Sequence, residues 1–493
     1  MPRPLLIDGA WVPAHGAATR EIRNPATLEL LDTASDASPA DVDSAVQAAK
    51  RAQHAWWKTP GVEKAKYLHD IATKIRGRER ELSTLMTKET GKPLIEAVDC
   101  IDWVAACFDY YAEVGRRSWG NSMPPVLPHQ VNFTVKEPYG VVAAIVPFNF
   151  PLLLMSWKVA PALMAGNAVV CKPPHQNPLC NLMMAECYDG LPAGVVNVIT
   201  GGPETGRALV EHPDVDLIAF TGSVSVGRTI ASSAGANLKK VNLELGSVDP
   251  LIVFADADLD AAVPGTAWAR LLNAGQVCTS AKRIYVVQSI ASAFVERFVE
   301  HTRSLRLGDG LDPSTDLGPL ISERARARVE SQVARAIAQG ARVLAGGARP
   351  AHAGPGWFYQ PTVLADVQPT DTIVCEEVFG PIASIQVVAD ADAAIAAAAR
   401  SDFGLGANIY TKNLTWALTA MQEIKAGTFW INDPLTDNDA APFGGMRKSG
   451  MGRELGEEGL DAFRETKHVH LDFVPERKSF WFPYRQRRSE IPE

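Results

Sequence analysis

One cysteine lies in sequence surroundings that favour chemistry. Cys278 is part of residues 273–280 (NAGQVCTS), between a mostly apolar run at 267–272 and a β-branched run at 283–287. Gly275 allows a tight turn ahead of the thiol, because glycine adopts backbone angles that other residues avoid. A thiolate on such a turn is a strong nucleophile. Most free cysteines, however, are small apolar residues of a protein core. The local pattern alone therefore fits both a buried structural Cys278 and a catalytic one.

A glutamate ends another apolar run. Glu244 lies in residues 242–246 (NLELG). A carboxylate among apolar side chains has a raised pKa, which suits a general base working near neutral pH. The alternative is an ion pair with Lys239 or Lys240 and no chemical role.

Three more polar motifs follow apolar runs. Asn149, in residues 147–151 (PFNFP), is either a loop residue bonded to its own backbone or an amide donor for an oxyanion. Lys172, in residues 171–175 (CKPPH), reaches either solvent or a nucleotide. Residues 220–223 (FTGS) precede a helical pattern, whose N-terminus offers N–H groups to a phosphate. Because residues 201–206 (GGPETG) only approximate the dinucleotide fingerprint, these motifs alone leave nucleotide binding open.

Strands and helices alternate around these motifs. Strand-like runs at 141–146, 168–171, 195–199 and 217–220 are separated by segments of helical length. This pattern predicts a parallel sheet covered on both faces, the doubly wound α/β class. Ligands of such sheets bind at the carboxyl ends of the strands. We therefore expect the polar motifs to meet at one edge of the sheet.

The α/β pattern repeats over residues 250–445. We expect strands near 251–254, 283–287, 342–345, 383–387 and 428–431, and helices near 291–305, 322–339, 391–400 and 413–424. Earlier in the chain, short strands are expected over residues 5–35, a helix capped by Ser38, and further helix from about 63 to 118. The predicted units are a Rossmann-like dinucleotide-binding domain (1–128 and 138–246), a catalytic domain (247–445) and a small β oligomerisation arm (129–137 and 466–493).

Composition excludes several classes of protein. The 493 residues carry a formal net charge of −8, which argues against general nucleic-acid binding. The 7 cysteines lack paired spacing, so we expect reduced thiols and no metal site. No run is long enough to predict a membrane span or a signal peptide, and we expect a cytoplasmic protein. The basic, aromatic tail at 478–488 is interpreted as a subunit contact and not as an RNA-binding segment.

Seven motifs, in order, resemble the aldehyde dehydrogenase superfamily from about residue 6 to about residue 473. They are residues 147–151, 172–173, 220–223, 244–246, 275–278, 376–381 (EEVFGP) and 442–450 (PFGGMRKSG).

The resemblance implies a non-acylating oxidoreductase that converts an aldehyde to its acid with NADP or NAD. Cys278 would form a thiohemiacetal and then a thioester, with Asn149 and the Cys278 N–H as the oxyanion hole. Glu244 would activate water for hydrolysis of the thioester, with Lys158 nearby, and Glu377 would bind the nicotinamide ribose. The family also forms homodimers or homotetramers.

Further positions follow from the resemblance. Those implied to contact the nucleotide are Pro147, Phe148, Lys172, Pro173, His175, Gly206, Phe220, Gly222, Ser223, Val226, Leu245, Gly246, Glu377 and Phe379. Those implied to line the substrate pocket are Phe150, Leu154, Trp157, Leu272, Val277, Thr279, Asp437 and Phe443.

The sequence departs from the family pattern at three places. Phe148 replaces the tryptophan often found before the oxyanion asparagine, a conservative change. His175 stands where strictly NAD-dependent members often carry a glutamate, so we predict that NADP is accepted, alone or alongside NAD. Residues 245–250 (LGSVDP) lack a second glycine and a lysine common in relatives, with no consequence that the sequence assigns. The implied pocket has an apolar wall and two acidic residues, Asp437 and Asp439. A cationic or hydroxylated small aldehyde is a possible substrate, and a medium-chain or aromatic aldehyde is equally compatible.

Three alternatives compete with this interpretation. An acylating relative would pass the thioester to coenzyme A, but the Glu244 base would compete with that thiol. A cysteine hydrolase acting on esters would give residues 220–223 and 376–381 no role. An inactive binding protein of the same fold is disfavoured because Cys278, Glu244 and Asn149 are all present.

Overall fold

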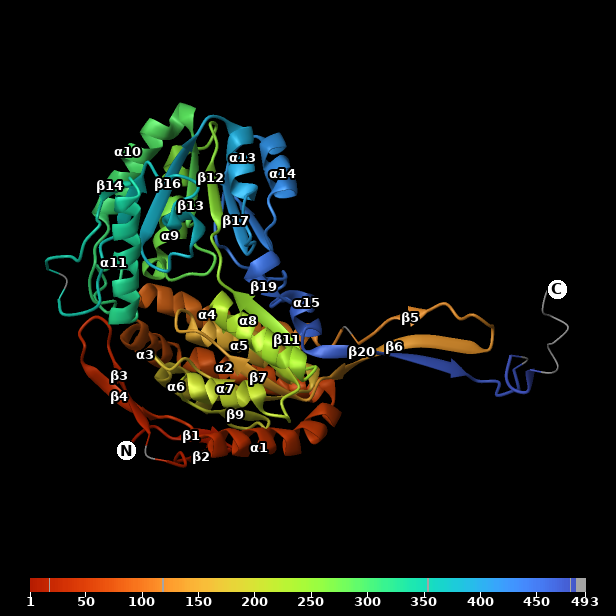
Figure 1. Cartoon of the computed structure of the whole chain (residues 1–493). Coiled ribbons are helices and arrows are strands. Elements are labelled where there is room, and N and C mark those ends of the chain that lie inside the picture. Colours follow the sequence, from red (N-terminus) through yellow and green to blue (C-terminus); the bar gives the residue numbers. More distant parts are fainter. Residues whose placement is uncertain (17, 118, 353, 479, 485–493) are drawn as a thin grey trace, which may run out of the picture.

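Two sheets and a projecting arm organise the chain (Figure 1). The structure, a computed structural model, describes residues 1–16, 18–117, 119–352, 354–478 and 480–484. Parts of the predicted tail and arm, residues 479 and 485–493, lie outside the described residues.

The first sheet has the strand order β19-β11-β10-β7-β8-β9-β1-β2. Its parallel centre is β7 (Val141–Ile145), β8 (Ala168–Lys172), β9 (Val196–Val198), β10 (Leu217–Gly222) and β11 (Lys240–Leu245). Its antiparallel margins are β1 (Leu5–Ile7), β2 (Ala10–Val12) and β19 (Gly450–Met451). The chain builds outward from β7 through β8 and β9, then returns to place β10 on the other side of β7. This reversal creates the crevice in which such sheets bind ligands.

Helices cover both faces of this sheet, which confirms the predicted doubly wound class. Val142 and Ala144 of β7 pack into one core, whereas Val141, Ala143 and Ile145 pack into the other, as the alternation of a strand requires. The helices around the sheet are α1 (Pro39–Lys58), α2 (Gly61–Gly77), α3 (Glu79–Thr90), α4 (Leu94–Val114), α5 (Pro151–Ala165), α6 (Leu179–Ala185), α7 (Pro203–Glu211) and α8 (Val224–Ala236). The predicted cap of α1 is present, since Ser38 and Asp41 form a capping box.

The second sheet has the order β14-β15-β16-β13-β12-β17-β18 and is parallel except at β14. Its strands are β12 (Pro250–Val253), β13 (Arg283–Val287), β14 (Arg342–Ala345), β15 (Thr362–Ala365), β16 (Ile382–Val388), β17 (Gly406–Tyr410) and β18 (Thr428–Ile431). Its helices are α9 (Leu259–Leu271), α10 (Gln288–Ser304), α11 (Glu323–Ala338), α12 (Thr372–Cys375), α13 (Ala391–Ala399) and α14 (Leu414–Glu423). The sequence had not predicted β15 or β17.

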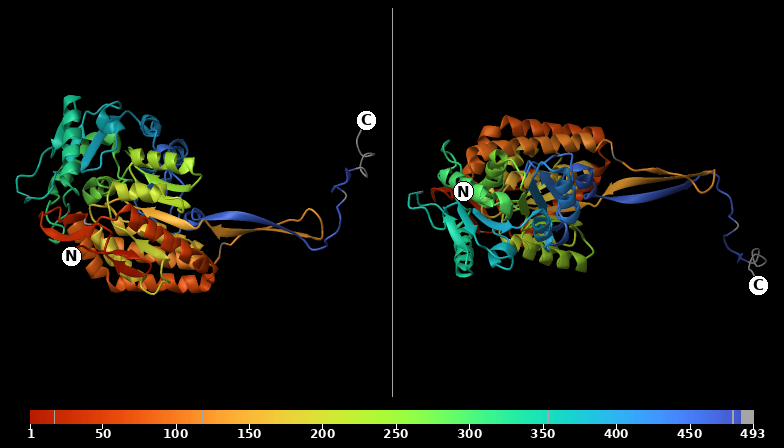
Figure 2. Two further views of the ribbon diagram at one scale, coloured as in Figure 1. Left: turned by 60° about the horizontal axis from the view of Figure 1, so that its bottom comes forward. Right: turned by 90° about the horizontal axis from the view of Figure 1, so that it is seen from above.

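The arm projects from the body as a ribbon, seen in the three views of Figures 1 and 2. It pairs β20 (Arg464–Asp472) with β6 (Gln130–Pro138) along their whole lengths and adds β5 (Ser122–Met123). Val131 and Leu471 are paired with each other and exposed. That this arm joins subunits stays a prediction, which a monomeric mass in light scattering of the whole chain would contradict.

Two other segments complete the chain. A hairpin of β3 (Thr19–Arg23) and β4 (Leu30–Ser35) lies near the N-terminus. After the second sheet, the chain returns to the first one through β19 and then forms α15 (Gly456–Asp461), which packs on α5. Among the described residues, no helix combines the length and apolar character needed to cross a membrane.

Candidate active site

Cys278 lies just beyond a strained turn that follows α9. Asn273 and Ala274 have φ values of 51° and 55°, in the left-handed region that residues with a Cβ seldom adopt. Gly275 follows with φ 72°, and a Cβ there would come 2.2 Å from the Gly380 carbonyl oxygen. Glycine is therefore required, as the sequence suggested. The Cys278 side chain is only partly buried and can be reached by a substrate.

A buried arginine ties this turn to a neighbouring loop. The Arg270 guanidinium donates to the Gly275 carbonyl and to Ser280 Oγ, at 3.4 and 2.9 Å. It also donates to the carbonyls of Val378 and Gly380, at 3.1 and 2.7 Å. Its Nε donates to the carbonyl of Ile382, the first residue of β16, at 2.5 Å. Arg270 thus fixes the cysteine turn against the segment that carries Glu377.

Asn149 is tied to the same turn. The Asn273 side-chain amide donates to the Asn149 carbonyl at 3.1 Å, and the Asn273 N–H donates to Glu96 Oε1 at 3.2 Å. Asn149 itself is buried between β7 and α5. Its side-chain oxygen has no hydrogen-bond partner among the described residues. The structure thus brings the predicted oxyanion amide and the predicted nucleophile to one place.

Glu244 is a buried carboxylate at the end of β11. Neither oxygen reaches a described partner with hydrogen-bond geometry, although the Gly445 N–H is near enough to favour the ionised form. Burial raises the pKa of Glu244 well above its usual value, and the nearby Glu454 raises it further, whereas Lys158 and Arg453 lower it. Gly444 leaves room for the carboxylate, because a Cβ there would lie 2.7 Å from Glu244 Oε1.

Lys158 forms a fully buried ion pair with Glu454, a residue that sequence reasoning missed. The Lys158 ammonium also donates to Thr221 Oγ1 at 2.6 Å. Burial raises the pKa of Glu454, and Lys158 lowers it. Glu454 lies in the segment 453–458 (RELGEE), which offers three glutamates and no local sign of which one turns inward. Lys158 therefore acts electrostatically on two buried glutamates, Glu244 and Glu454.

The thiol of Cys278 is not ionised at rest. Burial raises its pKa to about 12; Lys282 lowers it, whereas Asp249, Glu377 and Glu244 raise it. The influence of Glu244 shows that the thiol and the buried carboxylate lie within electrostatic range of each other.

A cavity of about 500 Å³ opens at the carboxyl ends of β7, β8 and β10. The predicted nucleotide residues that line it are Pro147, Phe148, Lys172, His175, Gly206, Phe220, Gly222, Ser223 and Val226. The lining also includes Pro174, Pro203 and Thr221, which lie within the motifs quoted above but were assigned no contact, and Gln176, Arg207 and Thr229, which the sequence did not predict. Pro173, Leu245, Gly246, Glu377 and Phe379, also predicted, are not part of the lining of this cavity.

The chemistry of the cavity fits a phosphate-bearing nucleotide. Ser223 caps α8, whose N-terminal N–H groups border the cavity. Lys172 is buried, and burial lowers its pKa to about 8. Burial, and then Lys172 and Arg20, lower the pKa of His175 to about 4, so this imidazole is neutral at physiological pH. A volume of this order is typical of small-molecule sites.

Glu377 and Phe379 lie between this cavity and the cysteine turn. The Phe379 ring contacts that of Phe148 edge-on, with centroids 5.8 Å apart. Glu377 accepts from the Ser247 N–H at 3.0 Å and packs so closely on Gly246 that a Cβ there would lie 2.4 Å from Glu377 Oε2. The two residues thus adjoin the cavity from the side of Cys278.

Aromatic side chains belong to the apolar cluster against which Cys278 packs. Trp157 and Phe443 have ring centroids 5.0 Å apart, and Phe150, Leu154 and Cys278 belong to the same apolar cluster. The Lys92 ammonium lies 3.8 Å from the Phe150 ring centroid. The other predicted pocket residues are more dispersed. Val277 and Thr279 flank Cys278 and are buried, whereas Leu272 packs against the apolar core of the second sheet, to which Leu435 also belongs. Burial raises the pKa of Asp437, two residues beyond Leu435, to about 7.

Comparison with known proteins gives one consistent result. The model of the aldehyde dehydrogenase family matches residues 11–469. A chloroplastic aminoaldehyde dehydrogenase of Arabidopsis thaliana is 40% identical over 480 residues, 95% of this chain and 96% of that protein. The crystal structure of betaine aldehyde dehydrogenase from Staphylococcus aureus with NAD+ superposes with a TM-score of 0.95 at 35% identity, covering 97% of this chain and 96% of that one. An Escherichia coli structure described as an NADP dependent enzyme superposes with a TM-score of 0.93 at 37% identity, covering 96% and 98%.

Proposed function

Because the chain belongs to the aldehyde dehydrogenase family and is an NAD(P)-dependent oxidoreductase, we propose that Cys278, Asn149 and Glu244 carry out its aldehyde oxidation. The main support for this assignment is that segments from both sheet domains come together at one site. The domain of the second sheet supplies the strained turn before the accessible Cys278. The first sheet supplies Asn149, whose carbonyl accepts a hydrogen bond from Asn273, and the buried carboxylate of Glu244.

In the proposed mechanism the Cys278 thiol gives up its proton to solvent and its sulfur bonds to the aldehyde carbon. The C=O π bond breaks, and the carbonyl oxygen takes up the negative charge. The Asn149 amide and the Cys278 N–H donate to that oxygen. When bound, the nicotinamide nucleotide supplies the two-electron acceptor that leaves the carbon as a thioester of Cys278. Lys172, Ser223, Glu377 and Phe379 would hold that nucleotide.

Glu244 then takes a proton from a water molecule, and the hydroxide attacks the thioester carbon. The acid leaves and the Cys278 sulfur is released. A carboxylate with a raised pKa is suited to accept that proton near neutral pH. Lys158 stabilises the ionised form of Glu244 between turnovers, because it lowers the pKa of that carboxyl group.

We further propose an aldehyde that carries a cationic amine as substrate. The names of the relatives, aminoaldehyde and betaine aldehyde dehydrogenases, support this class. The pocket offers Trp157 and Phe443 as rings for a cation, since Lys92 already occupies a face of Phe150.

A panel of aldehydes tests this function. Formation of reduced nicotinamide is expected from an ω-aminoaldehyde and from betaine aldehyde, with kcat/KM about tenfold above that of a neutral aldehyde of equal length, the size of one or two cation–π contacts. Equal kcat/KM values for the neutral and cationic substrates would rule out the amine preference. If no aldehyde reduced either nucleotide, the proposed site would be wrong as a whole.

We also propose that the protein accepts NADP+ as well as NAD+. His175 lines the nucleotide cavity without a negative charge, and its neighbours Lys172 and Arg20 are cationic. At equal concentrations, kcat/KM with NADP+ is expected within about tenfold of that with NAD+. His175→Glu should lower NADP+ use by about tenfold to a hundredfold, because a carboxylate repels a 2′-phosphate across a few ångströms. Turnover with NAD+ is the control, and a wild-type preference for NAD+ above a hundredfold would contradict the proposal.

A further inference from the structure

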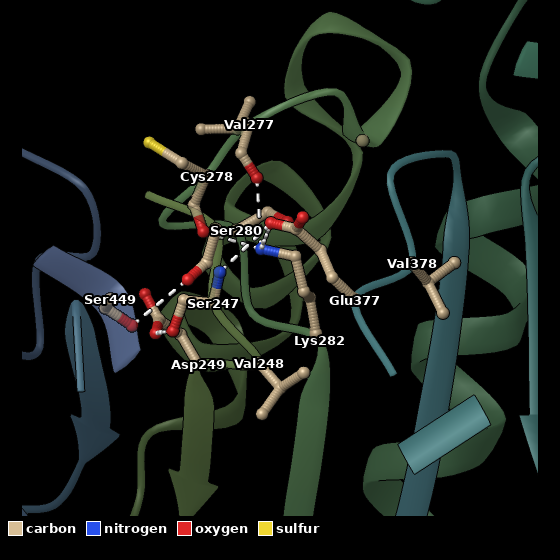
Figure 3. Close-up of polar contacts among 12 residues, drawn as sticks. Ser247, Val248, Asp249, Val277, Cys278, Ser280, Lys282, Glu377, Val378 and Ser449 are labelled. Atoms are coloured by element: carbon tan, nitrogen blue, oxygen red, sulfur yellow. Dashed lines mark hydrogen bonds and ion pairs between the residues drawn. The ribbon is translucent and has the colours of Figure 1, made fainter. Parts of the chain in front are cut away.

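A buried ammonium lies directly behind the nucleophile and has no role in the mechanism above. Lys282 precedes β13 and is only 2% exposed. Its ammonium donates to the Val277 carbonyl at 3.1 Å and to the Cys278 carbonyl at 2.6 Å. Figure 3 shows these two bonds, with the Cys278 sulfur on the side of the turn away from the ammonium. The lysine therefore contacts the backbone of the nucleophile and leaves its sulfur free.

The bond to Val277 matters because of peptide geometry. In a trans peptide the C=O of one residue and the N–H of the next point in opposite directions from one rigid plane. Holding the Val277 oxygen, which also accepts from the Ser280 N–H at 3.3 Å, thus fixes where the Cys278 N–H points. A cation on the oxygen also polarises the peptide, which makes its N–H a stronger donor.

We propose that Lys282 is a positioning residue of the oxyanion hole, which aims and strengthens the Cys278 N–H by holding the carbonyl of Val277. This inference rests on the proposed function, because that function assigns this N–H to the oxyanion. Lys282 touches no reacting atom and acts through the peptide alone.

Two acidic side chains lie around the Lys282 ammonium and oppose the effect of burial on its charge. Glu377 Oε1 lies 3.9 Å from the ammonium, and the same oxygen accepts from the Ser247 N–H. Asp249 is buried beside it, and its carbonyl accepts from the Lys282 backbone N–H at 3.0 Å. Burial lowers the pKa of Lys282, and Arg270 lowers it further, whereas Glu377 and Asp249 raise it.

The same contacts give a role to a stretch that the sequence left unexplained. Ser247 and Asp249 belong to residues 245–250, where this chain departs from the pattern of its relatives. Ser247 donates from its hydroxyl to Asp249 and from its N–H to Glu377, so the segment links both carboxylates that surround the ammonium. A cation supplied by Lys282 thus joins the cysteine turn to the loop of Glu377 (Figure 3).

Substitution of Lys282 by methionine tests the proposal in the whole enzyme. Methionine keeps the apolar length of the side chain and removes the charge and the donors. Loss of one oxyanion donor costs about 10²–10³ in kcat, and Lys282→Met weakens one of two donors, so we expect kcat to fall by about 10- to 100-fold. The KM for the aldehyde should change less than about threefold, since the contact gains strength only in the transition state.

Lys64→Met is the matched control. Lys64 is also fully buried, and within the described part of the chain its ammonium donates only to the Trp57 carbonyl, at 3.2 Å, in the α1–α2 region away from the site. Both variants are compared by thermal melting, and Lys64→Met should keep kcat within twofold. If Lys282→Met kept kcat within twofold, or lost it only in parallel with a raised KM, the inference would be overturned.

The outcome is distinguishable from a failure of the proposed function. If Cys278→Ala kept its turnover, the proposed function itself would fail. If Cys278→Ala were inactive and Lys282→Met fully active, only the role of Lys282 would fail. If Lys282→Met does not fold, Lys282→Gln replaces it, because glutamine keeps a hydrogen-bond donor without the charge. This variant is expected to fold and to lose kcat by a smaller factor. An unchanged kcat in Lys282→Gln would overturn the inference.

Discussion

Replacement of Cys278 by alanine is expected to lower aldehyde-dependent reduction of the nucleotide by about 10⁴-fold or more, the size of effect seen when a covalent nucleophile is removed. The change deletes one sulfur from a partly exposed side chain, so folding should be little affected. Nucleotide binding should also persist, because the cavity at β7, β8 and β10 does not include Cys278. Steady-state formation of reduced nicotinamide, with melting temperature and nucleotide affinity alongside, measures all three.

Cys375→Ala is the matched control for this variant. Cys375 is the exposed cysteine of α12 and should keep full turnover when changed. A Cys278→Ala enzyme with more than a tenth of normal activity would show that the nucleophile has been assigned wrongly. Hydrolysis of an activated ester at full rate, without any aldehyde oxidation by the wild type, would instead favour a cysteine hydrolase.

The pH dependence of alkylation checks the same assignment. Burial raises the pKa of Cys278 to about 12, so the thiolate is a small fraction of the nucleotide-free enzyme at neutral pH. Its alkylation by iodoacetamide, followed by mass spectrometry to separate it from Cys375, should speed up about tenfold per pH unit from pH 7 to 10, as expected for a thiol titrating above that range.

The sequence predicted the parts of the site that follow strands. Asn149, Lys172 and Glu244 lie at or just after the ends of parallel strands, and one edge of a sheet collects such residues whatever the distances between them in the chain. The alternating apolar pattern therefore sufficed to expect the doubly wound fold and the edge at which its ligand binds. The assignment of Cys278 as nucleophile needed the family resemblance, because its local pattern also fits a core cysteine.

The remaining features depend on contacts between segments far apart in the chain. Glu454 reaches Lys158 only because the chain returns through β19 to the first sheet, an event that no local pattern announces. Lys282 and Arg270 are cations in apolar surroundings, and sequence alone favours a solvated position for such residues. Both are instead buried against carbonyl oxygens of turns that only the folded chain creates.

Glu244→Gln is expected to separate the two halves of the reaction. Attack by Cys278 and oxidation need no base at Glu244, so one equivalent of reduced nicotinamide should form per site in a rapid burst. Hydrolysis of the thioester should then slow by about 10²–10⁴-fold, the usual contribution of a general base. Stopped-flow absorbance of reduced nicotinamide measures the burst and the slow turnover together.

The raised pKa of Glu244 predicts how the hydrolysis rate and the stability of the enzyme change with pH. Burial raises the pKa of Glu244, so the fraction of ionised base, and with it the hydrolysis rate of the wild type, should rise with pH until this carboxyl group is fully ionised. The same raised pKa means that the protonated form favours folding, and this stabilisation is lost as pH rises through the pKa of the folded state. Glu244→Gln should therefore melt no lower than the wild type at alkaline pH, which excludes unfolding as the cause of slow turnover. A variant that lost the burst together with the turnover would place Glu244 in the acylation step and contradict its role as the hydrolytic base.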